Sequence, residues 1–291
     1  MGLTGTGEIV AAAAAVGRGV GAFNVILLEH AEALVAGAEA ADAPVVLQIS
    51  ENAVRYHGAL APLSQATLAI ARAAAVPVAV HLDHATDLDL VREAVELGIG
   101  SVMYDASALP YGENLRATAD VAAWCHAHGA WVEAELGEVG GKDGVHAPGA
   151  RTDPEEAAAY VEATGVDALA VAVGTSHAML TRSAVLDFAL VERLRAAVPV
   201  PLVLHGSSGV ADPDLTRAVH SGLTKVNIAT HLNAAFTARV RAHLAAHPDV
   251  VDPRRYLAPG RDAVAAEVTR LLGVLRAVAP LTPAATPHPS A

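Results

Sequence analysis

The chain has 291 residues, 53% of them hydrophobic, and its formal net charge is −12 because 31 acidic residues outnumber 19 basic ones. This charge argues against nucleic acid and anionic membranes as partners. The longest apolar runs are too short to span a membrane, and no basic segment followed by an apolar stretch opens the chain, so we expect no signal peptide. The single cysteine, Cys125, is typical of a reducing cytoplasm and is predicted to be a buried thiol in a helix.

Short apolar runs alternate with longer helical patterns along the whole chain. The predicted strands are Val20–Val25, Pro44–Ser50, Pro77–Asp83, Gly100–Asp105, Ala130–Leu136, Asp167–Gly174, Pro201–His205 and Thr224–Ala229. The predicted helices are Glu29–Ala41, Ala61–Ala74, Leu88–Leu97, Leu115–His126, Pro154–Ala163, Val185–Ala196, Asp212–Ser221 and His231–His247. This alternation, over roughly 250 residues, indicates an α/β fold, a closed (β/α)8 TIM barrel. An open doubly wound sheet is disfavoured because no glycine-rich dinucleotide fingerprint follows the first strand.

The chain shows no linker or internal repeat, so we predict one domain over residues 1–276. A further helical segment within Asp252–Val274 adds to the C-terminal end of the barrel. Residues 277–291 are rich in proline and alanine and are predicted to be disordered. The glycine-rich stretch Gly137–Ala150 is too long for an ordinary connection and is interpreted as a lid over the barrel.

Polar residues occupy alternate positions of seven predicted strands, mostly near the strand ends. They are Asn24, Gln48, Ser50, His81, Asp83, Ser101, Asp105, Glu133, Glu135, His205, Lys225 and Asn227. Because alternate residues of a barrel strand point inward, these side chains are expected to meet at the C-terminal mouth, where barrel enzymes have their active sites.

Three histidines lie at or just past strand ends: His84, His177 and His205. Neutral imidazoles with carboxylates nearby suit a divalent metal, zinc first, with positions left open for a substrate. His81 is expected to make a hydrogen bond inside the barrel instead.

Two short loops are candidates for binding an anion. The small-residue loop His205–Gly209 follows the seventh strand, and Asn227–Thr230 follows the eighth. Loops at these positions of a barrel often bind phosphate through backbone amides and a helix N-terminus. Taken alone, a Gly-Ser-Ser-Gly run more often marks a turn.

Taken together, the motifs make the chain resemble the class II, metal-dependent fructose- and tagatose-bisphosphate aldolases. The resemblance covers residues 7 to about 276. The motifs are Gly21–Val25, Gln48–Ser50, His81–His84, Ser101–Asp105, Glu133–Gly137, Gly174–His177, Leu204–Gly206, Lys225–Thr230 and Asp252–Arg254.

The resemblance implies a zinc-dependent (or other divalent-metal) aldolase that cleaves or forms a ketose phosphate through a dihydroxyacetone-phosphate enediolate, with an aldehyde as the second substrate. A monovalent cation is a further candidate cofactor, and a cytoplasmic homodimer or homotetramer is expected. By the resemblance His84, His177 and His205 hold the metal, Asp83 protonates the aldehyde oxygen, and Glu135 is a carboxylate near the metal. The substrate and its phosphate would contact Asn24, Ser50, Gly206, Ser208, Asn227, Ala229 and Thr230.

Two departures from the family pattern concern the substrate and the base. After His177 the family has a glycine, then an aromatic residue and a lysine, whereas this chain has Ala178–Thr181 with Arg182 as the nearest cation. The lid glutamate that serves the family as general base is replaced by Asp143, beside Lys142.

Two alternatives stay open from the sequence. A Schiff-base aldolase needs a reactive lysine, and Lys225 is the only candidate on a strand, although its position favours an ion pair with an inward carboxylate. The second alternative is a metal-binding barrel that binds a sugar phosphate without aldolase activity, or an isomerase or hydrolase.

Overall fold

The centre of the molecule is a closed ring of parallel strands. The structure is a computed structural model that describes residues 2–136, 151–177 and 179–276. Among these residues eight strands, β2 to β9, pair with their neighbours in sequence, and β9 pairs with β2 to close the ring. The strands are β2 (Val20–Asn24), β3 (Val45–Ser50), β4 (Pro77–Ala85), β5 (Ser101–Tyr104), β6 (Trp131–Leu136), β7 (Ala168–Val171), β8 (Leu202–Leu204) and β9 (Leu223–Ile228). The predicted (β/α)8 barrel is therefore confirmed.

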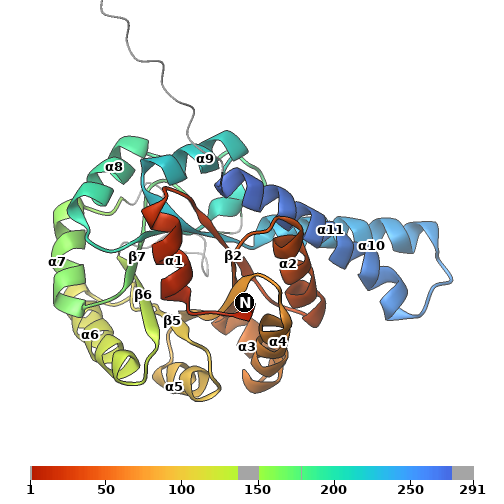
Figure 1. Ribbon diagram of the computed structural model, residues 1–291, viewed down its shortest axis with the longest axis horizontal. Helices are drawn as coiled ribbons and strands as arrows, with labels where there is room; N and C mark the ends of the chain where they lie inside the picture. The colour runs from red at the N-terminus through yellow and green to blue at the C-terminus, as the bar shows by residue number, and fades with distance from the viewer. Residues whose placement is uncertain (1, 137–150, 178, 277–291) are drawn as a thin grey trace, which may run out of the picture.

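Helices surround the ring of strands (Figure 1). They are α1 (Thr6–Ala15), α2 (Leu28–Ala40), α3 (Glu51–His57), α4 (Ala61–Ala73), α5 (Leu88–Glu96), α6 (Tyr111–Ala127), α7 (Pro154–Thr164), α8 (Phe188–Ala197), α9 (Asp212–Ser221), α10 (Thr230–Ala246) and α11 (Pro253–Leu275). A two-residue strand, β1 (Gly2–Leu3), pairs with the start of β4. None of the helices within the described ranges is long and apolar enough to cross a membrane.

The main differences between the structure and the sequence prediction concern two helices and one long predicted strand. The sequence does not predict α1, whose run of alanines has no clear period, or α3, which starts directly after β3 at the Ser50 cap. The predicted strand Asp167–Gly174 ends at Val171 because the next residue bonds elsewhere. The amide of Ala172 donates to Thr152 Oγ1, and its carbonyl accepts from the Thr152 amide. Cys125 is fully buried in α6 as predicted, and burial raises the pKa of its thiol to about 11.

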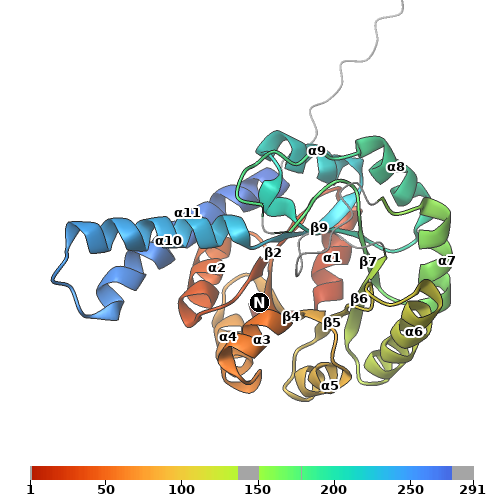
Figure 2. The same ribbon diagram turned by 180° about the vertical axis from the view of Figure 1, so that it is seen from behind.

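Helix α1 closes the N-terminal end of the barrel. Its Ile9 and Ala13 pack against Val20, Val46 and Ala79, which lie early in their strands. Figure 1 shows α1 lying across this end, and Figure 2 views the molecule from behind. Because α1 blocks one end, the other end of the barrel is the one that substrates can reach.

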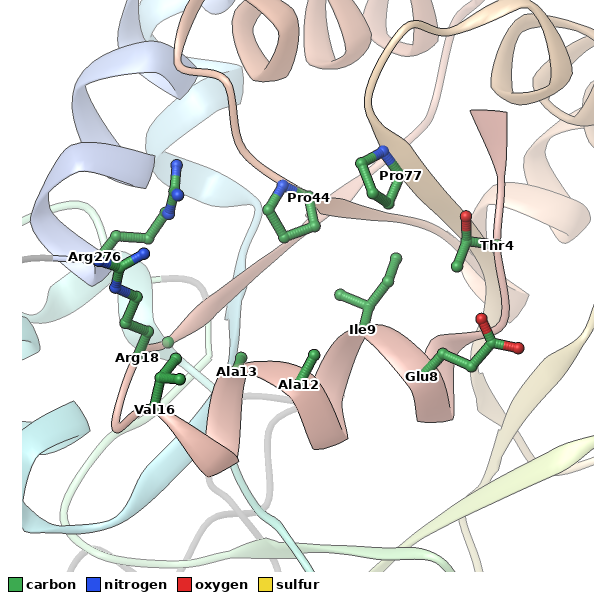
Figure 3. Close-up of a pocket in the computed structure, with 11 residues that line it drawn as sticks. Thr4, Glu8, Ile9, Ala12, Ala13, Val16, Arg18, Pro44, Pro77 and Arg276 are labelled. Carbon is green, nitrogen blue, oxygen red and sulfur yellow. The ribbon is translucent and has the colours of Figure 1, made fainter. Parts of the chain in front are cut away.

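A pocket of about 320 Å³ is lined by α1 and by residues at or just before the starts of β2, β3 and β4. In Figure 3 the apolar face of α1 lines one side of it, Pro44 and Pro77 lie opposite, and the side chains of Arg18 and Arg276 lie near one another at one end. The pocket contains none of the polar residues that the sequence singled out, so it is separate from the predicted site.

Helices α10 and α11 form a hairpin that extends sideways beyond the ring of helices (Figures 1 and 2). Toward the barrel, α11 packs on α2 at Gly37, whose carbonyl accepts a hydrogen bond of 3.0 Å from Thr269. A Cβ atom built at Gly37 would lie 2.6 Å from the carbonyl oxygen of Ala265 and 2.7 Å from Cβ of Val268. Only glycine allows the two helices to approach this closely.

This contact predicts that Gly37→Ala destabilises the protein, because the added methyl group must push α2 and α11 apart. The expected loss of unfolding free energy is about 1–3 kcal/mol, measured by urea denaturation. Gly273→Ala is the matched control on α11, since nothing lies within 4 Å of its added methyl group, and it should be neutral or stabilise by up to ~1 kcal/mol. Equal stabilities for the two variants would contradict the interpretation.

Candidate metal centre and active site

Three histidines from different parts of the barrel meet at its open end. His84 lies near the end of β4, His177 follows β7, and His205 follows β8. One nitrogen from each ring can be chosen so that all three lie within 4.8 Å of one another. The rings are nearly perpendicular in pairs, with centroids 4.6 to 5.7 Å apart. The predicted meeting of these three imidazoles is confirmed, and their arrangement around one point is suited to a metal ion.

An unusual backbone conformation accompanies His84. The pairing of β4 with β5 is irregular between Leu82 and Ala85, and His84 has φ of 52°, in the left-handed region. Such a conformation costs about 1–3 kcal/mol in a residue other than glycine, so the surroundings must hold it. The following Thr86 is fixed by Glu51 at the start of α3, which accepts from the Thr86 amide at 2.6 Å and from its hydroxyl. Helix α3 therefore fixes the turn that contains His84.

Two buried carboxylates lie behind the imidazoles. His84 Nδ1 lies 2.9 Å from Asp105 Oδ2, and His205 Nε2 lies 2.9 Å from Glu133 Oε1. A carboxylate can only accept, so these two ring nitrogens carry the hydrogen, and at His205 Nε2 the contact with Glu133 is shorter than the 3.1 Å contact with Asn227 Nδ2. The other nitrogens, Nε2 of His84 and Nδ1 of His205, are 3.0 Å apart. Rings held in this way turn these two nitrogens toward the same point, which suits a cation there.

Glu135 is a third carboxylate at this centre. It is buried, and its Oε2 lies 3.4 Å from His205 Nδ1, the nitrogen that faces His84. Glu135 and Glu133 are two positions apart on β6, so both point into the barrel. Glu133 lies on the far side of the His205 ring and Glu135 on the side of the other histidines.

Asp83 is buried next to the histidines within a set of amide side chains. Gln48 donates to it at 3.4 Å and Asn227 at 3.5 Å, and Gln48 also donates to Asn24 at 2.7 Å. Burial acts to raise the pKa of Asp83, but the neighbouring His84, His205 and Lys225 outweigh it and the pKa is lowered. Asp83 is therefore a carboxylate in the resting site.

The two candidate anion loops contact one another. Ser208 Oγ accepts from the amides of Ala229 (3.3 Å) and His231 (3.2 Å), at the start of α10. Gly206 has φ of 66°, and a Cβ atom there would lie 2.6 Å from the carbonyl oxygen of Ser176. Glycine is therefore required where the loop after β8 passes the loop of His177. Thr230 begins α10, so the amides beside it lie at a helix N-terminus, which attracts anions.

Other predicted residues have different neighbours. The Ser50 hydroxyl caps α3 by accepting from the Ala53 amide. Arg182 pairs with Asp212 and donates through Nε to the Val210 carbonyl at 2.7 Å, so much of its donor capacity is used within the protein. Asp143 lies outside the described residues, as do Lys142 and Ala178.

Two predictions about contacts of polar residues inside the barrel are confirmed. His81 Nδ1 lies 2.9 Å from Ser101 Oγ inside the barrel, and burial, the largest cause, lowers its pKa to about 3. Lys225 forms an ion pair with Glu133 at 2.8 Å and donates to Asn227 Oδ1 at 2.9 Å. Its side chain is fully buried. A lysine enclosed in this way is not available to form a Schiff base with a substrate.

The sequence reasoning did not assign roles to three residues that hold the site together: Asp105, Glu133 and Glu51. The first two share the inward parity of the polar set, so their strand positions gave a signal. No local pattern identifies Glu51, because its partner Thr86 is far away in the sequence and meets it only in the folded barrel.

Comparison with known proteins gives consistent matches over almost the whole chain. The family model for fructose-bisphosphate aldolase class II matches residues 4–279. A fructose-bisphosphate aldolase from Geobacillus stearothermophilus is 42% identical over 253 residues, which are 86% of this chain and 88% of that protein.

Solved structures agree with these matches. The YdjI aldolase from Escherichia coli K12 superposes with a TM-score of 0.83 at 32% identity, covering 94% of this chain and 97% of the other. A putative fructose-1,6-bisphosphate aldolase from Coccidioides immitis gives a TM-score of 0.83 at 29% identity, covering 92% and 94%.

The histidine cluster predicts that the purified protein binds about one divalent ion per chain and that His205→Ala loses it, because one of three nitrogen ligands disappears. Elemental analysis after dialysis measures the content and identifies the metal. The control His128→Ala removes an exposed histidine at the end of α6 and should leave the metal content unchanged. Full occupancy in His205→Ala would rule out the cluster as the metal site.

Proposed function

The chain belongs to the class II fructose-bisphosphate aldolase family and is a class II aldolase, and we propose that it cleaves or forms a ketose phosphate at the mouth of its barrel. The observation that carries this proposal is the meeting of His84, His177 and His205 within 4.8 Å, next to the buried Asp83. Family membership favours the aldol reaction over the isomerase or hydrolase considered from the sequence.

The three histidines are the proposed ligands of a divalent ion, with zinc as the first candidate. The donor set fits, because imidazole nitrogens suit zinc and three protein ligands leave positions open for a substrate. Asp105 and Glu133 hold two of the rings so that their other nitrogens, Nε2 of His84 and Nδ1 of His205, face one another at the centre. A divalent ion bound there would supply a Lewis acid that polarises the carbonyl of the ketose. A monovalent cation remains a further candidate.

Asp83 is the proposed acid and base for the aldehyde oxygen. In the cleavage direction a carboxylate can accept the proton of the hydroxyl group that becomes the aldehyde, and in the condensation direction it returns the proton. The lowered pKa of Asp83 keeps it ionised in the resting site, and only the ionised form can accept a proton in the first of these steps. Gln48 and Asn227 orient the carboxylate, and Asn24 beside Gln48 extends the same polar wall. Asn24 and Ser50 are the proposed lining of the substrate pocket.

The phosphate of a dihydroxyacetone-phosphate unit is proposed to bind where the loops after β8 and β9 meet. The proposed contacts to the phosphate come from Gly206, Ser208, Asn227, Ala229 and Thr230. The close passage of the chain at Gly206 and the helix N-terminus after Ala229 support this position. Ser208 joins the two loops through its hydroxyl, so both can act on one anion. Arg182 is a weaker candidate because of its pairing with Asp212.

The base that removes the proton beside the carbonyl is proposed to be Asp143, on the evidence of the sequence. Glu135 is the next candidate, because its carboxylate lies at the histidine cluster. A proton-exchange measurement on variants of each residue distinguishes Asp143 from Glu135 as the base.

The proposed activity predicts cleavage of fructose 1,6-bisphosphate or tagatose 1,6-bisphosphate that stops on exhaustive chelation and returns with zinc, because the carbonyl is then no longer polarised. A coupled assay for the triose phosphate product measures it. Borohydride is the control for covalent chemistry, and it should not inactivate the protein during turnover, since Lys225 is enclosed. Cleavage that persists without metal would contradict the proposal.

Asp83 and Asp143 are proposed to act in different steps. Replacing them should therefore affect proton exchange and cleavage differently. Exchange of the dihydroxyacetone-phosphate proton with solvent deuterium needs the base but not the group that serves the aldehyde. We therefore expect Asp83→Ala to lose cleavage by orders of magnitude while keeping exchange and metal. Asp143→Ala should lose both activities, and Asp143→Glu should keep substantial activity. Exchange at the parent rate in Asp143→Ala would transfer the role of base to Glu135, which Glu135→Gln then tests.

The remaining proposals concern the location, the oligomeric state and the partners of the protein. We propose a cytoplasmic homodimer or homotetramer that acts on small sugar phosphates and binds neither nucleic acid nor membranes. The projecting α10–α11 hairpin, with the exposed apolar side chains of Leu244 and Val251, supports self-association. A monomer in sedimentation velocity would contradict this part of the proposal.

A further inference from the structure

The interior of the barrel contains a buried ion pair whose presence stability alone does not explain. The side chains of Lys225 and Glu133 are both fully enclosed, and Lys225 Nζ lies 2.8 Å from Glu133 Oε2. Taking two charges out of water is unfavourable, and well-packed apolar residues often replace such a pair without loss of stability. Most barrels fill this region with Val, Ile and Leu. The pair therefore has a role beyond packing to fill.

The two oxygens of Glu133 have different partners. Oε2 faces the ammonium group of Lys225, whereas Oε1 lies 2.9 Å from Nε2 of His205. Both contacts require Glu133 to accept, since Lys225 has only donors and the His205 nitrogen that faces it carries a hydrogen. The opposite nitrogen of the same ring, Nδ1, faces His84 Nε2 at 3.0 Å. The chain of contacts thus runs from Lys225 through Glu133 to the side of His205 that faces the histidine cluster.

We propose that Glu133 and Lys225 are positioning residues that hold His205 in its metal-binding tautomer and orientation. Glu133 keeps the hydrogen on Nε2, so that the lone pair of Nδ1 points to the metal. Lys225 holds the carboxylate in place from the other side and also donates to Asn227 Oδ1, so it ties Glu133 to β9. The inference rests on the proposed function only in taking His205 as a metal ligand.

A glutamine in place of Glu133 could not accept from both His205 and Lys225 as the carboxylate does. An amide has one accepting oxygen and one donating nitrogen. If its oxygen accepts from His205, its NH2 group faces the ammonium of Lys225. If it turns round, its NH2 group faces Nε2 and favours the tautomer with the hydrogen on Nδ1, so that Nδ1 has no lone pair for the metal. Either arrangement disturbs the site, although the side chain keeps its shape.

The test measures metal affinity in the purified variants by competition with a chelator, together with the visible spectrum of the Co²⁺-substituted protein. Glu133→Gln should weaken metal binding by about 10- to 100-fold, as is common when the acceptor behind a ligating histidine is lost. The Co²⁺ spectrum should change, because the geometry at His205 changes. Lys225→Met should show a loss of the same kind.

The double variant Lys225→Met/Glu133→Gln gives the decisive comparison. Without the ammonium group the amide can turn its oxygen to His205 with no donor opposing it, so the double variant should bind metal more tightly than either single variant. If Glu133→Gln does not fold, the comparison of the double variant with Lys225→Met still decides. No recovery in the double variant would overturn the proposal.

Leu68→Ala is the control for general destabilisation. It removes a fully buried side chain from α4, away from the histidines, and should lower stability while leaving the metal affinity and the Co²⁺ spectrum unchanged.

Parent affinity and an unchanged spectrum in Glu133→Gln would also refute the inference. If His205→Ala itself retains metal, the proposed metal site fails. If His205→Ala loses metal but Glu133→Gln does not, only this inference fails.

Discussion

The ion pair of Lys225 and Glu133 lies at the point where the polar contents of the barrel join. Each ion loses hydration worth on the order of several kcal/mol, which their mutual attraction must offset. The attraction is strong here because both groups are enclosed and because each has a further hydrogen-bond partner, His205 for the glutamate and Asn227 for the lysine. Removing one charge alone would leave the other without a partner in a medium that solvates it poorly.

A line of polar contacts connects this pair with both ends of the barrel. Toward the N-terminal end of the barrel, His81 lies 4.0 Å from Glu133 and forms a hydrogen bond with Ser101. The Ser101 hydroxyl in turn contacts Thr6 of α1 at 2.5 Å. Toward the open end, His205 and Asn227 connect the pair with the histidine cluster and with Asp83. Helix α1, which closes one end of the barrel, and the site at the other end are therefore connected by one buried network. Such networks stabilise one arrangement when every member has a partner, and they are costly when a member is lost.

The site combines this rigid interior with strained or close-packed backbone at its edge. The left-handed conformation of His84 is held by α3 through Glu51, and the passage of Gly206 against Ser176 brings the loops of His205 and His177 together. Each histidine thus comes from a different strand end.

The sequence by itself determined the eight-strand order, the inward parity and the residue types of the site. The period of two in a strand fixes which side chains share a face. It assigns five residues to the barrel interior, namely Asp83, Glu133, Glu135, Lys225 and Asn227. The ion pair of Lys225 with an inward carboxylate followed from the same parity, as did the hydrogen bond of His81.

Only the tertiary structure decided the partners. Parity does not say which carboxylate lies behind which imidazole, and that choice sets the nitrogen that each ring offers to a metal. It also does not reveal that the hydroxyl of Ser50 caps a helix, that Ser208 bridges two loops, or that Arg182 pairs with Asp212. Helix α1 escaped prediction because an alanine run has no apolar period, and its position is fixed by the strand ends that it covers. Short-range patterns determine the direction of a side chain, whereas its partner depends on segments that only barrel closure brings together.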